Sequence, residues 1–339
     1  MRSLGSATIV QLMPREVSAN GQDIIASAIA NRLGIARHFA IAGEYGPVPP
    51  ETRLVISHNP QDGADAAVLG RLPNSCKVVL HLHYQLGQLT KVQTECLAMS
   101  IARADLVVTP AEFLTNGGAQ AFPKVPWSTV WNGVDASVFR PVLRLEREDW
   151  KREQGIGGSS FVALFVGRLV PAKGLAVLEW LAGHLPADTH LAVQYFDESY
   201  GADTGLCLPD RNVTLVPQSR MTVKSLIPYA DVLLLPSQSE VAPLVVIEAL
   251  MSGVPVLATP ATPFYDELTS KGIAGEDLIV VGSPVNDEFL RGLAGLRQAG
   301  TRDDRSRVVV AECARRAGLS IEDTTRVLYS VYSASTGRA

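Results

Sequence analysis

The sequence of 339 residues is poor in aromatic side chains and in cysteine. Aromatic residues make up 6% of the chain, and most of its 47% hydrophobic content is aliphatic or alanine. This balance favours parallel sheets covered by helices over an all-β fold. The four cysteines, Cys76, Cys96, Cys207 and Cys313, follow no C-x-x-C spacing. We therefore expect buried thiols in a reducing compartment and no zinc site.

The chain also lacks a long hydrophobic run and an excess of basic charge. No stretch reaches the roughly 18 apolar residues of a spanning helix, and the first apolar run stops at Pro14, which suits a strand better than a signal peptide. The net charge is −4 and the isoelectric point about 5.9. We expect a cytoplasmic protein without a nucleic-acid partner and without stable membrane insertion.

Several motifs that would assign other activities are missing. No G-x-G-x-x-G follows a predicted strand, which disfavours a dinucleotide-binding dehydrogenase. No P-loop motif and no G-x-S-x-G nucleophile elbow occur. No D-x-D ends an apolar strand, as a metal-dependent transferase of the other common fold would require.

Apolar strands alternate with helical stretches along the whole chain. The order strand, helix, strand predicts an α/β fold with two doubly wound, Rossmann-like domains facing each other across a cleft. A turn and a charged helix, which we expect to be solvated, separate the halves near residues 130–152. We predict an N-terminal domain over 1–142, a C-terminal domain over 143–318 and a final helix over 319–339. Ligands should bind beyond the carboxyl ends of the strands.

The first candidate site segment is GRLVPAKG, residues 167–174, which follows the apolar strand 161–166. Gly167 permits close approach of a ligand to the backbone. Arg168 and Lys173 offer a guanidinium and an ammonium group that together suit a diphosphate. The alternative is a surface loop with two solvated cations.

The second candidate segment is PSQSEVAPLVVIEALMSG, which follows the apolar strand 231–235. A helix should begin near Pro243, and its free amides at Leu244 and Val245 could hold a phosphate. Glu240 and Glu248 are suited to accept hydrogen bonds from sugar hydroxyls, and with Leu244 they form one stripe if the helical phase extends back. Alternatively, Glu240 only offsets the helix dipole and Glu248 is exposed.

Histidines end two predicted strands of the first half. His83 is the last residue of the strand 77–83, where its imidazole could stabilise charge during transfer. His81 shares that strand, and His58 ends the preceding one, so either could take this place. A histidine pair could also bind metal, but no third ligand is near in sequence. Gly21 precedes the first helix, whose amides could face an acceptor or a phosphate.

The segments WNGVDASVFRP, FVGRLVPAKG, ADVLLLPSQSE and VVIEALMSGVPVLAT resemble, in order and spacing, the family 4 retaining glycosyltransferases. The resemblance implies a GT-B fold, donor binding mainly by the C-terminal domain and a final helix that crosses back to the N-terminal one. It implies that Arg168 and Lys173 neutralise the donor diphosphate, that Glu248 holds the ribose and Glu240 the donor sugar, and that His83 is the cleft histidine.

We therefore expect a metal-independent, retaining transfer of a hexose or N-acetylhexosamine from a nucleotide-sugar, with UDP ahead of GDP as the nucleotide, to a small soluble acceptor. Near-neutral charge in the first half gives little reason to expect an anionic membrane. A lipid-linked or polysaccharide acceptor, an epimerase of the same fold and a non-catalytic binding protein stay open. The family commonly has Phe-Gly where this chain has Ala242-Pro243, which removes one backbone donor.

Overall fold

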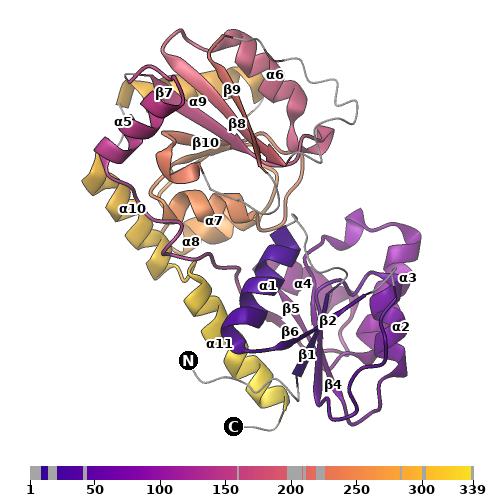
Figure 1. The fold of residues 1–339 in the computed structure, drawn as a ribbon. Coiled ribbons are helices and arrows are strands. Elements are labelled where there is room, and N and C mark those ends of the chain that lie inside the picture. The colour runs from indigo at the N-terminus through magenta and orange to yellow at the C-terminus, as the bar shows by residue number, and fades with distance from the viewer. Residues whose placement is uncertain are drawn as a thin grey trace. The chain divides into compact units, whose positions relative to one another are not determined.

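The computed structural model describes residues 9–13, 21–40, 44–158, 160–196, 208, 211–218, 226–282, 285–299 and 303–336. The chain divides into two compact units (Figure 1). Unit 1 comprises Met1–Gly133 with Ile321–Ala339, and unit 2 comprises Val134–Ser320. These units are groups of residues in mutual contact, and the domain boundaries predicted after residues 142 and 318 stay predictions.

Unit 1 contains a six-stranded parallel sheet with the strand order β2-β1-β3-β4-β5-β6. This order reverses between β1 and β3, as in flavodoxin-like folds. Its elements are β1 (Ile9–Met13), α1 (Gly21–Leu33), β2 (Ala36–Phe39), β3 (Leu54–Ser57), α2 (Gly63–Arg71), β4 (Lys77–His81), the 3₁₀ turn η1 (Leu86–Gln88), α3 (Lys91–Arg103), β5 (Leu106–Thr109), α4 (Glu112–Ala121), β6 (Trp127–Thr129) and α11 (Ile321–Ser335).

Both faces of this sheet are buried, because successive strand residues point to opposite sides. In β3, Leu54 and Ile56 pack with α1 and with the C-terminal helix α11, where Tyr332 is fully buried. Val55, from the same strand, packs on the other side with residues of α2 and α3 such as Leu97. The sheet therefore has a helical layer on each face, as an apolar parallel strand requires.

Unit 2 contains a second six-stranded parallel sheet, with the order β12-β11-β10-β7-β8-β9. This is the dinucleotide-fold order, and it reverses between β7 and β10. Its elements are α5 (Arg144–Glu153), β7 (Phe161–Val166), η2 (Pro171–Lys173), α6 (Leu175–His184), β8 (Thr189–Phe196), β9 (Val213–Gln218), η4 (Ile227–Tyr229), β10 (Val232–Leu235), α7 (Leu244–Met251), β11 (Val256–Ala258), α8 (Phe264–Ser270), β12 (Leu278–Val280), α9 (Val285–Ala299) and α10 (Asp304–Arg316).

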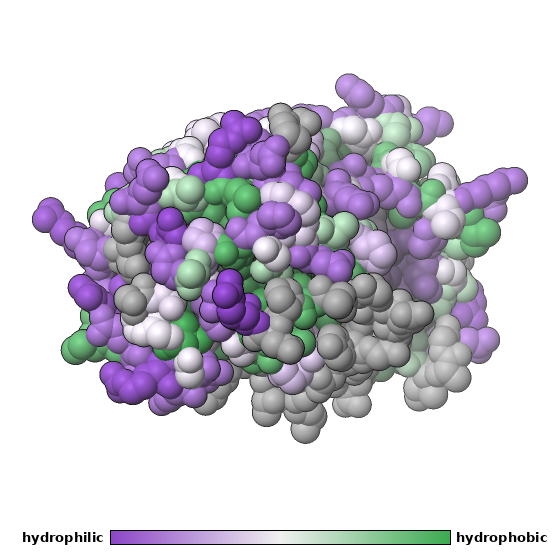
Figure 2. Space-filling view, turned by 90° about the horizontal axis from the view of Figure 1, so that it is seen from above, coloured by the Kyte–Doolittle hydropathy of each residue, from purple (hydrophilic) through white to green (hydrophobic). Residues whose placement is uncertain are grey.

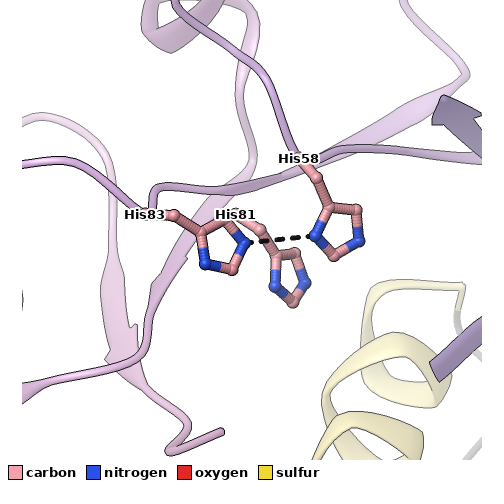
Figure 3. Close-up of side chains that lie close together, drawn as sticks. All are labelled: His58, His81 and His83. Carbon is pink, nitrogen blue, oxygen red and sulfur yellow. Dashed lines mark hydrogen bonds between the residues drawn. The ribbon is translucent and has the colours of Figure 1, made fainter. Parts of the chain in front are cut away.

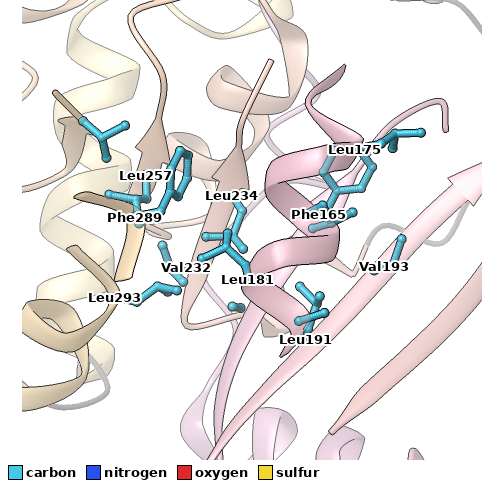
Figure 4. Close-up of a cluster of buried hydrophobic side chains, with 14 of the residues drawn as sticks. Phe165, Leu175, Leu181, Leu191, Val193, Val232, Leu234, Leu257, Phe289 and Leu293 are labelled. Atoms are coloured by element: carbon cyan, nitrogen blue, oxygen red, sulfur yellow. The ribbon is translucent and has the colours of Figure 1, made fainter. Parts of the chain in front are cut away.

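The helices α6 and α9 cover one face of the second sheet (Figure 4). Phe165 and Leu234 project from neighbouring strands into this core, where they meet Leu181 of α6 and Phe289 of α9. All four side chains are completely buried. The predicted class, an α/β fold with two doubly wound parallel sheets, is confirmed.

The charged helix α5 differs in part from its prediction as a solvated helix. Lys151 is buried, and its ammonium group lies 3.1 Å from Asp231 Oδ2 and donates to the Ser160 carbonyl over 2.8 Å. The same Asp231 oxygen accepts the backbone N–H of Val162 over 2.8 Å. A buried ion pair needs such added hydrogen bonds to offset desolvation. Most charged residues of α5 are exposed, as predicted, and the burial of Lys151 was not predicted because its partners are distant in sequence.

The face of the molecule in Figure 2 shows hydrophobic residues scattered among hydrophilic ones. Exposed hydrophobic side chains occur in both units, for example Val92 and Met99 on α3 and Leu145 on α5. Among the described residues, no helix is both long and apolar enough to cross a membrane.

Gly174 is the residue at which unit 2 most clearly requires glycine. It joins η2 to α6 with φ of +78°, and a Cβ atom there would lie 1.9 Å from the Pro236 carbonyl oxygen. The backbone after β7 thus lies directly against the backbone after β10. Only a residue without a side chain permits both the left-handed conformation and this approach.

We expect Gly174→Ala to destabilise the protein by about 2 kcal/mol or more, because the new methyl group displaces the Pro236 backbone and strains φ. Thermal and urea unfolding followed by circular dichroism measure the loss. The matched control is Gly183→Ala inside α6, where a Cβ meets nothing within 4 Å. That change should be neutral or stabilising by up to about 1 kcal/mol. Equal stability of the two variants would contradict the conclusion that position 174 requires glycine.

Candidate active site

Three loops of unit 2 meet beyond the carboxyl ends of β7, β10 and β11. The N–H of Gln238, after β10, donates to the carbonyl of Ala172, after β7, over 2.9 Å. The N–H of Glu240 donates to the carbonyl of Ala261, after β11, over 3.0 Å. The first two loops flank the point at which the strand order reverses, where open α/β sheets bind their ligands.

The loop after β7 carries Gly167, Arg168 and Lys173. The Arg168 side chain is exposed, and within the described residues it makes no hydrogen bond or ion pair. Lys173 ends the η2 turn. A Cβ at Gly167 would lie 3.4 Å from the Phe165 ring, an ordinary contact. A larger residue at position 167 would therefore not clash with the rest of the protein, so packing alone does not require glycine there.

Lys173 and Glu240 form an ion pair that joins two of these loops. The distance from Lys173 Nζ to Glu240 Oε1 is 2.6 Å, and the side chains are only 25% and 10% exposed. Such a charge-assisted hydrogen bond is strong in a partly desolvated setting. The structure therefore brings together the cation and the acid that the sequence predicted as separate contacts for diphosphate and sugar.

Tyr265 of α8 adds a polar group near Glu240 that was not among the predicted site residues. Its hydroxyl is buried and has no hydrogen-bond partner in the described structure. Burial, and then the negative charge of Glu240, raise the pKa of Tyr265. A buried hydroxyl without a partner is costly. No sequence signal pointed to it, because the α8 helix was not predicted.

The helix α7 begins at Leu244, one residue later than predicted, with Pro243 at the N-cap. The carbonyl of Pro243 accepts the N–H of Val246 over 3.1 Å. In the described structure no acceptor is found for the N–H groups of Leu244 and Val245, so both remain available to an anion. Because Glu240 precedes the helix, the predicted continuous stripe from Glu240 through Leu244 is wrong.

Glu248 lies in the second turn of α7 and is half-buried. Among the described residues its carboxyl group has no hydrogen-bond or ion-pair partner. Burial raises the pKa of Glu248 to about 7. The alternative of a fully exposed helix residue is thereby excluded, and the group is poised to change charge near neutral pH.

Three histidines gather in unit 1 at the carboxyl ends of β3 and β4 (Figure 3). His58 follows β3, His81 ends β4, and His83 lies two residues further on, because β4 is shorter than predicted. His58 Nδ1 lies 3.3 Å from His83 Nε2, and His81 Nε2 lies 2.7 Å from the Tyr332 hydroxyl. No third histidine is near His81 and His83 in the sequence. In the structure, the pairing of β3 with β4 places His58 beside them.

The three imidazoles are neutral at physiological pH. Burial lowers the pKa of His83 to about 4. Burial also lowers the pKa of His58 and of His81 well below the ordinary value, and the neighbouring imidazoles lower it further. His83 is the most exposed of the three. It therefore remains the histidine best placed to meet a ligand, as a neutral hydrogen-bonding group rather than as a cation.

Gly21 is the first residue of α1, and residues 14–20 before it lie outside the described residues. Gly21 and His83 belong to unit 1, and the candidate donor residues belong to unit 2. The predicted roles of all these residues in binding and catalysis remain proposals.

The model of the family "Glycosyl transferases group 1" matches residues 204–293, which include Glu240, Glu248 and the start of α7. The D-inositol 3-phosphate glycosyltransferases of Mycobacterium bovis and Mycobacterium tuberculosis are 29% identical over 223 residues, which cover 60% of this chain. The match covers 43% of those relatives, so the chain spans less than half of their length.

Solved structures show the same fold at low identity. The structure of Anabaena HepE in complex with UDP-glucose matches 96% of this chain and 99% of its own, with a TM-score of 0.74 at 17% identity. Sucrose-phosphate synthase from Thermosynechococcus elongatus matches 98% of this chain and all of its own, with a TM-score of 0.71 at 14% identity. The predicted GT-B fold is therefore confirmed, and the family model together with the mycobacterial relatives shows the predicted similarity to group 1 glycosyltransferases.

Proposed function

We propose that this chain is a retaining, metal-independent glycosyltransferase that moves a hexose or N-acetylhexosamine from a nucleotide-sugar, with UDP the preferred nucleotide, to a hydroxyl of a small soluble acceptor in the cytoplasm. The observation that carries the proposal is the Lys173–Glu240 pair, which lies at the strand-order reversal of unit 2. Binding of UDP-glucose by Anabaena HepE and the inositol phosphate named for the mycobacterial relatives support this donor and acceptor class.

The donor diphosphate would be held by positive charge and by backbone amides. Arg168 has no partner in the described structure, and the amides of Leu244 and Val245 are open at the start of α7. Lys173 would exchange its bond with Glu240 for one with the diphosphate. These groups would offset the charge that develops as the sugar departs, so a metal ion is not needed for that purpose.

The two acidic residues would bind the sugars of the donor. Glu240, once released from Lys173, would accept hydrogen bonds from hydroxyls of the transferred sugar, and Glu248 from those of the ribose. Carboxylates accept from neutral hydroxyls, which explains acidic groups beside a diphosphate. His83 would contact the transferring group as a neutral imidazole.

For the chemical step we propose a same-face displacement. The acceptor oxygen bonds to the anomeric carbon as the bond from that carbon to the diphosphate oxygen breaks. The departing oxygen takes the proton of the acceptor hydroxyl, and the configuration is retained. Proton nuclear magnetic resonance of the first-formed product distinguishes retention from inversion.

Two alternative functions can be distinguished from the proposed one by simple assays. An epimerase of this fold would convert the donor without any acceptor, whereas a transferase leaves the sugar configuration of the donor unchanged. A transferase for lipid-linked or polysaccharide acceptors would sediment with liposomes at low salt or would glycosylate only such acceptors.

We expect UDP to raise the melting temperature of the protein more than GDP does at equal concentration. A ligand at 100 times its dissociation constant stabilises the native state by about 2.7 kcal/mol. Differential scanning fluorimetry with UDP, GDP, ADP and inorganic pyrophosphate gives the order. A larger shift with GDP would overturn the uridine assignment, and no shift with any nucleotide would overturn the proposed function.

Replacing Lys173 with Ala should lower kcat by about 100- to 1000-fold, the usual effect of removing one group that stabilises transition-state charge. The readout is initial-rate transfer from UDP-glucose at saturating donor. Lys91→Ala, at an exposed position of α3, is the matched control and should keep full activity. Near-normal turnover in the Lys173 variant would reject this role.

Affinity for UDP-glucose should weaken about tenfold between pH 8 and pH 6. The pKa of Glu248 is raised to about 7, so the carboxylate that accepts from the ribose is about nine-tenths protonated at pH 6. Glu248→Gln should bind more weakly at pH 8 and show no such dependence. Glu179→Gln in α6 should behave like the unchanged protein. Isothermal titration calorimetry measures all three, and a persistent slope in Glu248→Gln would exclude Glu248 as the titrating group.

A further inference from the structure

We propose that His58, His81 and His83 form a binding site for one transition-metal ion, with Zn²⁺ the ion that fits best. Each histidine offers one ring nitrogen, and these three atoms lie within 4.8 Å of one another. All three residues belong to unit 1 (Figure 3). The proposal goes beyond the transfer reaction, in which no metal acts on the diphosphate.

The spacing of the nitrogen atoms already matches part of a zinc site. Two nitrogens bound to one zinc at about 2.0 to 2.1 Å and at a tetrahedral angle lie about 3.3 Å apart. The distance from His58 Nδ1 to His83 Nε2 is 3.3 Å. The His81 nitrogen lies within 4.8 Å of these two atoms.

Hydrogen bonding alone does not satisfy this cluster. His58 Nε2 is buried and has no partner in the described structure. A neutral imidazole has one N–H and one lone pair, and a single contact, between His58 Nδ1 and His83 Nε2, joins two of the three rings. Neutral imidazole is the form that binds metal. A metal ion between His58 Nδ1 and His83 Nε2 would bind one lone pair from each nitrogen, and the ring that now donates would carry its proton on its other nitrogen.

The surrounding residues hold the rings as a metal site requires. The Tyr332 hydroxyl contacts His81 Nε2 over 2.7 Å and so fixes the orientation of that ring. The side chain of Gln22 donates to the backbone carbonyl of His58. Strand pairing places Ser57 beside Leu80, so His58 comes beside His81 at the same sheet edge. Partners of this kind orient metal-binding histidines.

The ligand set selects the class of ion. Three imidazoles suit Zn²⁺, Co²⁺, Ni²⁺ and Cu²⁺, whereas Mg²⁺ and Ca²⁺ prefer oxygen ligands. Three protein ligands leave a fourth position for water, as in zinc sites that are not purely structural. His83 is the least buried ligand, which gives the ion a route of entry. Metal binding would occupy the His83 nitrogen that we propose for the donor, so Zn²⁺ should inhibit transfer.

The test measures Zn²⁺ binding to the full-length chain, freed of any affinity tag and stripped with a chelator. Isothermal titration calorimetry with Zn²⁺ should show one ion per chain with a dissociation constant in the micromolar range or below. Co²⁺ should give the intense visible absorption of a four-coordinate site. His58→Asn should bind more than about tenfold more weakly, since even an outer partner of a metal site contributes about 10- to 100-fold.

The matched control is His184→Asn, which changes an exposed histidine of α6 outside the cluster and should bind like the unchanged protein. Zn²⁺ should raise the melting temperature of the unchanged chain and of His184→Asn. If His58→Asn fails to fold, the Co²⁺ spectrum of the unchanged chain decides alone. Absent or only millimolar Zn²⁺ binding, or equal binding by His58→Asn, overturns the proposal. Binding of UDP is measured separately, so failure of the metal site leaves the proposed function untouched.

Discussion

The ion pair between Lys173 and Glu240 is the contact on which the candidate donor site depends. It joins the loops that follow β7 and β10, two strands that are neighbours only because the strand order reverses between them. The pair is largely shielded from water, so each charge would be costly without the other. The same arrangement holds a cation and an acid ready for a ligand that supplies both an anion and hydroxyl donors. Gly174 makes this possible by letting the two backbones touch.

Much of the fold could be predicted from the sequence, because apolar strands and helix ends are local signals. The final helix predicted over 319–339 is present as α11. Long-range pairing could not be predicted in this way. The charge run of α5 predicts a solvated helix, but Lys151 is buried in an ion pair with Asp231, eighty residues further along the chain. A run of charged residues predicts solvent exposure only for those side chains that form no ion pair with a residue distant in sequence.

The sequence predicted individual residues of the candidate site but not which of them contact one another. Loop positions after apolar strands pointed to Lys173 and Glu240, but nothing in their spacing indicated that they pair. The histidine cluster was missed as a cluster, because the third member, His58, comes from the neighbouring strand, and strand register is not written in either segment alone. Three strand-end histidines in adjacent predicted strands are the signal that could have revealed it. The pKa of Glu248 depends on burial, which local sequence indicates only weakly.

Under the proposed function, the Lys173–Glu240 pair couples recognition of the diphosphate to recognition of the sugar. A diphosphate that takes the ammonium group from Glu240 removes the nearest positive charge from a shielded carboxylate, which is unfavourable. An intact nucleotide-sugar compensates, because its hydroxyls donate to that carboxylate. A nucleoside diphosphate without sugar does not, so the product of transfer gives back part of the binding free energy. Under this proposal, the charge arrangement would favour binding of the donor over retention of the spent nucleotide.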